Sequence, residues 1–195
     1  MCRITIDGIS PFASSEVGKY LTKTLSYTLI NKRPIIFLCI GSDRATGDSL
    51  GPLIGYKLKN SSKNNIYIYG SLENPIHSLN LSTILDKINS NFTNPFIVAI
   101  DACLGTVQDV GKIIIEDAPL CPGLGVKKEL PSVGDVSIKG VVNIYGSLEF
   151  TVLQNTRLYT VMSLADSISN GINYFINKFC NNKFSLKHWL LKNCY

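Results

Sequence analysis

The chain has 195 residues, of which 45% are hydrophobic and 17% are charged, a composition typical of globular proteins that excludes an intrinsically disordered chain. The formal net charge of +5 is modest and the lysines are dispersed, so we expect no nucleic-acid partner. The longest apolar run is too short to span a bilayer, and MCRITIDG lacks the apolar core of a signal peptide. We therefore expect a cytoplasmic protein with no membrane partner.

The length fits a single α/β domain. We expect an N-terminal helical extension over 1–32, a core over 33–178 and a C-terminal tail over 179–195, whose Trp189 docks on the surface.

Residues 1–13 are expected to form an irregular or strand-like lead-in. Apolar residues then recur every four positions, which predicts a helix of about four turns with Ser14 or Ser15 as its N-cap. These apolar residues are Val17, Leu21, Leu25 and Leu29.

Residues 35–52, IIFLCIGSDRATGDSLGP, contain the clearest pattern in the chain. The apolar, β-branched run over 35–40 predicts a buried central strand. Pro52 opens an apolar-periodic stretch, which predicts a helix with proline in its first turn. Ligands of open α/β sheets bind at such strand ends. The connection between strand and helix, residues 41–51, is called the crossing here, and it contains three glycines, Gly41, Gly47 and Gly51.

This crossing differs from a phosphate-binding P-loop, which has four residues between its glycines and then Lys and Ser/Thr. Gly41 and Gly47 have five residues between them, and Asp48 occupies the lysine position. A carboxylate repels phosphate, which disfavours both nucleotide binding and a phosphorylase-like reaction at this loop. Asp48 therefore either caps the following helix or belongs to an acidic site.

The next segments predict a strand over 66–69, a helical stripe over 81–88 and a strand over 95–101 that ends in Asp101. His77 lies in the loop between the first two, where a histidine is either structural or in contact with substrate. If the strands are parallel, Asp48 and Asp101 lie at the same edge of the sheet. Two acids at one edge form a site hypothesis.

The rest of the chain predicts strands over 111–116 and 141–145 and a long amphipathic helix over 158–176. A loop over 118–135, rich in proline and glycine, is expected to cover the site. The pattern as a whole predicts an α/β fold.

The six cysteines include no CxxC pair, and neither histidine has a cysteine at metal-site spacing, so we expect no zinc site and no cofactor. Cys39 and Cys103 fall in or beside predicted core strands and are expected to be small buried hydrophobic residues.

Four segments over about 33–178 together resemble the YyaC family of sporulation proteins, often labelled spore proteases: CIGSDRATGDSLGPLIG, IYGSLENPIHSLNL, AIDACLG and LQNTRLYTVMSLAD. That group is similar to germination proteases and hydrogenase-maturation endopeptidases. The resemblance implies a three-layer α/β/α sandwich with a mixed, mostly parallel five-stranded sheet, and a location in the forespore or spore interior.

In germination proteases, aspartates at the positions of Asp48 and Asp101 are the proposed catalytic pair. The resemblance therefore implies a peptidase-like hydrolase that acts on a peptide or protein substrate, such as a small spore protein. In the hydrogenase-processing relatives, acids at these positions and a histidine bind a metal. Residues 153–157 of this chain read LQNTR where those relatives supply the histidine, so we expect no metal. His77, from another loop, is the open alternative ligand.

Peptide hydrolysis by two carboxylates requires one ionised and one protonated group, and mutual repulsion between close acids produces that state. Backbone N–H groups over 47–51 are candidate oxyanion donors, and Arg157 is a candidate clamp for a substrate carboxylate. The alternative is a catalytically inactive spore protein that binds a peptide or partner at the same cleft. The candidate substrate-binding residues are Gly41, Ser42, Asp43, Gly47, Ser49, His77, Asn155 and Arg157.

Overall fold

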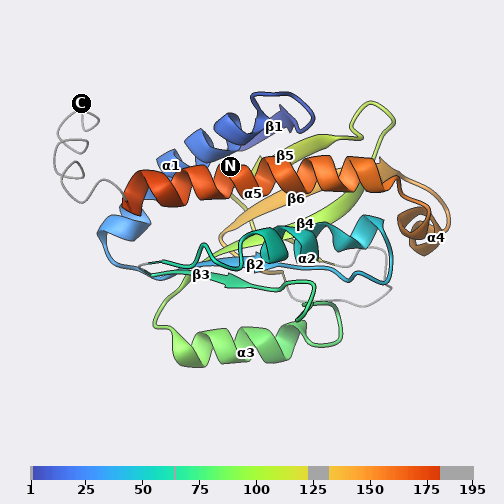
Figure 1. Ribbon diagram of the computed structural model, residues 1–195. Helices are drawn as coiled ribbons and strands as arrows, with labels where there is room; N and C mark the ends of the chain where they lie inside the picture. Colours follow the sequence, from blue (N-terminus) through green and yellow to red (C-terminus); the bar gives the residue numbers. More distant parts are fainter. Residues whose placement is uncertain (1, 64, 123–131, 181–195) are drawn as a thin grey trace.

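The computed structural model describes residues 2–63, 65–122 and 132–180. The predicted docking of Trp189 and nearly all of the predicted tail lie outside these residues. The described chain forms one six-stranded mixed sheet with helices on both faces (Figure 1), which confirms the predicted α/β/α fold. No helix within these three ranges is long and apolar enough to cross a membrane.

The strands are β1 Arg3–Asp7, β2 Ile35–Cys39, β3 Ile66–Tyr69, β4 Phe96–Gly105, β5 Lys112–Glu116 and β6 Val136–Ile144. Their order across the sheet is β1-β5-β6-β4-β2-β3. The pairs β2–β3, β2–β4 and β4–β6 are parallel, whereas β5 pairs antiparallel with both β1 and β6. Strand β2 therefore lies between two parallel neighbours, in the position predicted for a central strand.

The sixth strand, β1, comes from the lead-in and pairs antiparallel with β5, so the first 32 residues contribute a strand as well as a helix. Strands β4 and β6 are also longer than predicted. Strand β4 continues past Asp101 to Gly105, and β6 begins at Val136. The two strands pair with each other from Val98 with Val136 to Gly105 with Ile144. The added part of each strand therefore pairs mainly with the predicted part of the other, which satisfies its backbone hydrogen bonds.

The helices are α1 Ala13–Ile30, the 3-10 turn η1 Gly47–Ser49, α2 Leu50–Lys57, α3 Leu81–Asn91, α4 Glu149–Gln154 and α5 Leu158–Cys180. Helices α1, α2 and α5 lie on one face of the sheet and α3 lies on the other (Figure 1). The predicted serine cap of α1 is wrong, because the N-cap residue is Phe12 and no side chain caps the helix. Helix α4, which the sequence did not predict, follows β6 at one end of the molecule.

All five residues of β2 are buried, and they alternate between two hydrophobic clusters. Ile35, Phe37 and Cys39 pack in the cluster beneath α1, α2 and α5, whereas Ile36 and Leu38 pack in the cluster beneath α3. Side chains of a strand point alternately to the two faces, so a strand covered on both faces is apolar throughout. The continuous apolar run of β2 is therefore explained by its position.

Glycines allow the crossing after β2 to fold tightly against the end of that strand. A Cβ atom at Gly51 would lie 2.0 Å from the carbonyl oxygen of Ile40. Gly41 has φ of +137°, and a Cβ atom there would lie 2.1 Å from the carbonyl oxygen of Asp48. These glycines permit close approach of backbone segments, which is a role independent of phosphate binding.

We expect Gly51→Ala to lower the free energy of unfolding by about 1–3 kcal/mol, because the added methyl group meets a fixed backbone carbonyl. Gly146→Ala is the matched control, since its Cβ meets a side-chain atom, Val152 Cγ2 at 2.9 Å, and we expect a change within about 0.5 kcal/mol. Urea unfolding of both variants measures the difference. Equal stability of the two variants would show that the crossing can move away from β2.

Candidate functional site

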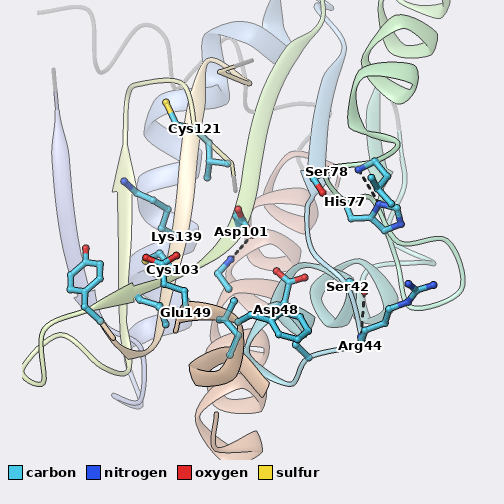
Figure 2. Close-up of a pocket in the computed structure, with 18 residues that line it drawn as sticks. Ser42, Arg44, Asp48, His77, Ser78, Asp101, Cys103, Cys121, Lys139 and Glu149 are labelled. Atoms are coloured by element: carbon cyan, nitrogen blue, oxygen red, sulfur yellow. Dashed lines mark hydrogen bonds between the residues drawn. The ribbon is translucent and has the colours of Figure 1, made fainter. Parts of the chain in front are cut away.

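A pocket of about 480 Å³ lies at the carboxyl ends of β2 and β4 (Figure 2). The chain passes from β2 to β3 on one side and later returns to β4 on the other side of β2, so the strand order reverses at this point. Ligands of open α/β sheets bind in the crevice at such a reversal. The pocket is lined from the crossing after β2, the loop after β3, strands β4 and β6, the loop after β5, Tyr145 and helix α4.

The structure places both predicted acids in this pocket, and Figure 2 shows Asp48 and Asp101 beside each other at its centre. Asp101 lies within β4, directly after the last residue that pairs with β2, where the Ile40 N–H donates to the Ile100 carbonyl at 2.8 Å. The Asp101 side chain lines the pocket just past the last residue pair of β2 and β4. Asp48 is the second residue of η1 and is not an N-cap, so the capping interpretation does not explain it.

Both carboxyl groups are only partly exposed, and their environments favour the protonated form. Burial and the charge of Asp48 raise the pKa of Asp101 well above its ordinary value, against the opposing effect of the Ala102 N–H at 2.8 Å. Burial also raises the pKa of Asp48, against the opposing effects of the Ser42 backbone and His77. Two such acids resist joint ionisation and titrate as a pair.

Of the predicted substrate-binding residues in the loops, Ser42 and His77 line the pocket. Three others, Gly41, Gly47 and Ser49, are buried in the crossing and do not line it, and Asp43 is exposed to solvent. The three buried residues instead contribute to the internal structure of the crossing. For example, the Ser49 hydroxyl donates to the Thr46 carbonyl at 2.6 Å, within η1.

The other two predicted substrate-binding residues lie beyond the pocket lining. The exposed Asn155 amide donates to the Thr151 carbonyl at 2.8 Å at the end of α4. The exposed Arg157 guanidinium lies 5.2 Å from the centre of the Tyr159 ring. Both residues follow the end of α4, and residues of α4 itself, Glu149, Phe150 and Leu153, line the pocket instead.

The described residues of the pocket do not form a metal site. Gln154 and Asn155, at the positions where the family resemblance would require a histidine, are exposed and outside the pocket lining. Among the described residues, no group of three His, Cys, Asp or Glu side chains is placed to hold a metal ion. His77 shares the pocket with the two acids but does not complete such a group.

The sequence analysis missed several residues of the pocket floor and wall. Cys103 follows Asp101 by two positions on the same strand, and this spacing was a usable signal that both face one side of the sheet. Lys139 lines the pocket because it pairs in register with Asp101 across β4 and β6, and it forms an ion pair with Glu116. Glu149 comes from α4.

Cys103 is partly buried in the pocket rather than packed in the core, which corrects the sequence-based expectation. Burial raises the pKa of its thiol to about 11, although the charge of Lys139 opposes this. The thiolate is the nucleophilic form of cysteine, so Cys103 is poorly suited to nucleophilic attack at neutral pH.

Comparisons with known proteins agree with the sequence motifs. The family described as "Protein of unknown function (DUF1256)" matches residues 10–171. The chain is 49% identical over 140 residues to the Bacillus subtilis protein named "Uncharacterized protein YyaC", covering 72% of this chain and 68% of that protein. A solved structure, the [NiFe] hydrogenase maturation protease HycI from Thermococcus kodakarensis, is 17% identical with a TM-score of 0.40, covering 74% of this chain and 98% of that one. The chain therefore belongs to the DUF1256 family and is a relative of YyaC.

Proposed function

We propose that the chain is a peptidase-like hydrolase in which Asp48 and Asp101 act as a pair. The observation that carries this proposal is their convergence in one pocket from two separate segments of the chain. The surroundings raise the pKa of both groups, and the charge of Asp48 contributes to the shift at Asp101. A pair that holds one proton contains both the base and the acid that hydrolysis of an amide requires.

In the proposed reaction, the ionised carboxylate removes a proton from water, and the resulting hydroxide bonds to the carbonyl carbon of the peptide. The protonated carboxyl group donates its proton to the carbonyl oxygen at the same time. The tetrahedral intermediate then returns that proton as its C=O bond re-forms, and the amine leaves with the proton first taken from water. Both acids regain their starting states, and one water molecule is consumed per bond cleaved.

The pocket wall supports a polypeptide as the substrate. Ala45, Leu120 and Leu153 line it together with Leu79 and Phe150, which are 73% and 61% exposed. Exposed apolar side chains at a pocket mouth are typical of sites that bind peptides or proteins. The resemblance to spore proteins makes small spore proteins the first substrates to test. This wall would equally serve a protein that binds a peptide without cleaving it, so cleavage itself is the decisive measurement.

We expect Asp48→Asn and Asp101→Asn each to reduce the rate of peptide cleavage by at least about a hundredfold, because each removes one half of the acid–base couple. The double variant should be little worse than either single variant, since the two groups act as a unit. Asp43→Asn is the matched control, because Asp43 lies on the same crossing but is exposed and outside the pocket lining. Cleavage of small spore proteins by all four variants, followed by mass spectrometry, measures these effects.

Full activity in both single variants would contradict the acid pair. Tight peptide binding by the unaltered chain, with no cleavage at any pH, would instead favour the alternative function of a binding protein. In that case the single variants should show graded losses of affinity for the peptide and no pH-dependent turnover.

The raised pKa of Asp101 also predicts a pH-dependent stability. The folded state binds the Asp101 proton more tightly than the unfolded chain does, where an aspartate has a pKa of about 3.9. The stability that this tighter proton binding gives is present below that pH and is lost as pH rises through the raised pKa of the folded state. Asp101→Asn cannot ionise and should therefore be more stable than the unaltered chain at pH 7, with a smaller difference at pH 3.5. Urea unfolding at both values measures this change, with Asp43→Asn as the control. A variant that is less stable at pH 7 would contradict the burial cost assigned to Asp101.

A further inference from the structure

We propose that Glu116 is a positioning residue of this site, which holds the Lys139 ammonium group away from Asp101 and so lets Asp101 keep its proton. The use of that proton in peptide hydrolysis rests on the proposed function, whereas the effect of Glu116 on the titration of Asp101 does not depend on cleavage. Glu116 lies on β5, and the strand order β5-β6-β4 places Lys139 of β6 between Glu116 and Asp101 of β4.

Four charged side chains of alternating sign follow one another across four neighbouring strands. Arg3 of β1 pairs in register with Glu116 of β5, and Lys139 of β6 pairs in register with Asp101 of β4. Glu116 and Lys139 are diagonal neighbours, because Glu116 stands opposite Ser137, two residues before Lys139. Residues two apart on a strand point to the same face, so the row lies on one face of the sheet. Its inner end, Lys139 and Asp101, lines the pocket.

The Glu116 carboxylate binds a cation on each side. Its Oε1 lies 3.5 Å from Arg3 Nε, and its Oε2 accepts a hydrogen bond from Lys139 Nζ. Arg3 is 62% exposed, whereas the Glu116 and Lys139 side chains are 21% and 30% exposed, so water screens their ion pair less. Figure 2 shows the Lys139 amine pointing away from Asp101. Within the described part of the chain, no ion pair joins Lys139 to Asp101.

This restraint matters because Lys139 is otherwise within reach of Asp101. Neighbouring strands lie about 4.8 Å apart, which the flexible lysine stem spans. A cation in contact with an aspartate favours the ionised form and lowers the pKa. With Lys139 turned toward Glu116, burial and the charge of Asp48 raise the pKa of Asp101, and the Ala102 N–H opposes them. Asp101 therefore keeps the proton that the proposed reaction donates to the carbonyl oxygen.

The test measures the titration of Asp101 by NMR in the full chain, labelled with ¹³C at the aspartate carboxyl carbons. Every sample carries Asp48→Asn, so that Asp101 titrates alone rather than as a member of a coupled pair. Addition of Asp101→Asn assigns the Asp101 signal by its loss. The other titratable side chains that line the pocket are the same in all samples, and they are Arg44, His77, Cys103, Cys121, Tyr145 and Glu149.

The variants separate the charge of Lys139 from any structural effect of Glu116. Glu116→Gln releases Lys139 while it preserves the size of the side chain, and Glu116→Ala is a second variant that releases it. Glu116→Gln combined with Lys139→Met removes both charges. Arg3→Gln is the matched control, because it removes the exposed partner of Glu116 and leaves Lys139 bound.

We expect Glu116→Gln and Glu116→Ala to lower the titration midpoint of Asp101 by about one unit, because the released Lys139 then pairs with Asp101. Addition of Lys139→Met should return the midpoint to its starting value, and Arg3→Gln should leave it unchanged. An unchanged midpoint in both Glu116 variants would overturn the proposal. A lowered midpoint that Lys139→Met does not restore would also overturn it, since the cause would then be structural.

The catalytic consequence is measured with Asp48 intact. If the chain cleaves peptides, Glu116→Gln should move the basic limb of kcat/KM to lower pH, because Asp101 must be protonated to act as the acid. Addition of Lys139→Met should return that limb to its original pH. Cleavage with an unmoved limb would overturn the role assigned to Asp101. A lowered Asp101 midpoint in a chain that cleaves no peptide would instead reject the hydrolase function and retain the restraint of Lys139 by Glu116.

Discussion

The site depends on one close contact, in which the crossing after β2 folds back onto the end of that strand. Gly51 lies against the Ile40 carbonyl, and Gly41 lies against the Asp48 carbonyl with a left-handed backbone. A side chain at either position would push the crossing outward, and Asp48 would move with it. Asp101 lies just past the last residue pair of β2 and β4, so this contact brings Asp48 into the same pocket as Asp101.

Ionisation of the buried pair has a cost in folding stability. Burial of Asp101 raises its pKa, so ionisation of this group at neutral pH costs stability. The chain compensates with two hydrophobic clusters, one on each face of a six-stranded sheet, and with the fully buried strand β2 between them. A destabilising group in a well-packed fold is typical of a functional site. The burial of two acids in such a fold supports a functional role for the pair, and the apolar pocket wall supports a polypeptide as its ligand.

Membership in the DUF1256 family and the relation to YyaC place the chain among similar proteins, but they assign no reaction. The proposed reaction rests instead on the electrostatics of the pocket. Asp101 pairs in register with Lys139, which forms an ion pair with Glu116, and Asp48 and His77 line the same pocket. The Gly41 N–H donates to the Ile76 carbonyl at 2.7 Å and the Ser42 N–H donates to the Asp48 carbonyl at 3.0 Å, so backbone hydrogen bonds join the loop before α3 to the crossing that carries Asp48.

The sequence alone was sufficient for the features that depend on local patterns. The apolar run predicted strand β2, the glycines after it predicted the crossing, and proline in the first turn predicted helix α2. Because the strands were expected to be parallel, Asp48 and Asp101 were predicted at one edge of the sheet. Only the tertiary structure determined which other residues reach the pocket. Lys139 lines the pocket because of the register between β4 and β6. Arg157 follows the end of α4 and lies outside the pocket lining. Strand register and the path of a short, exposed helix depend on contacts between residues distant in sequence, and no local periodicity encodes such contacts.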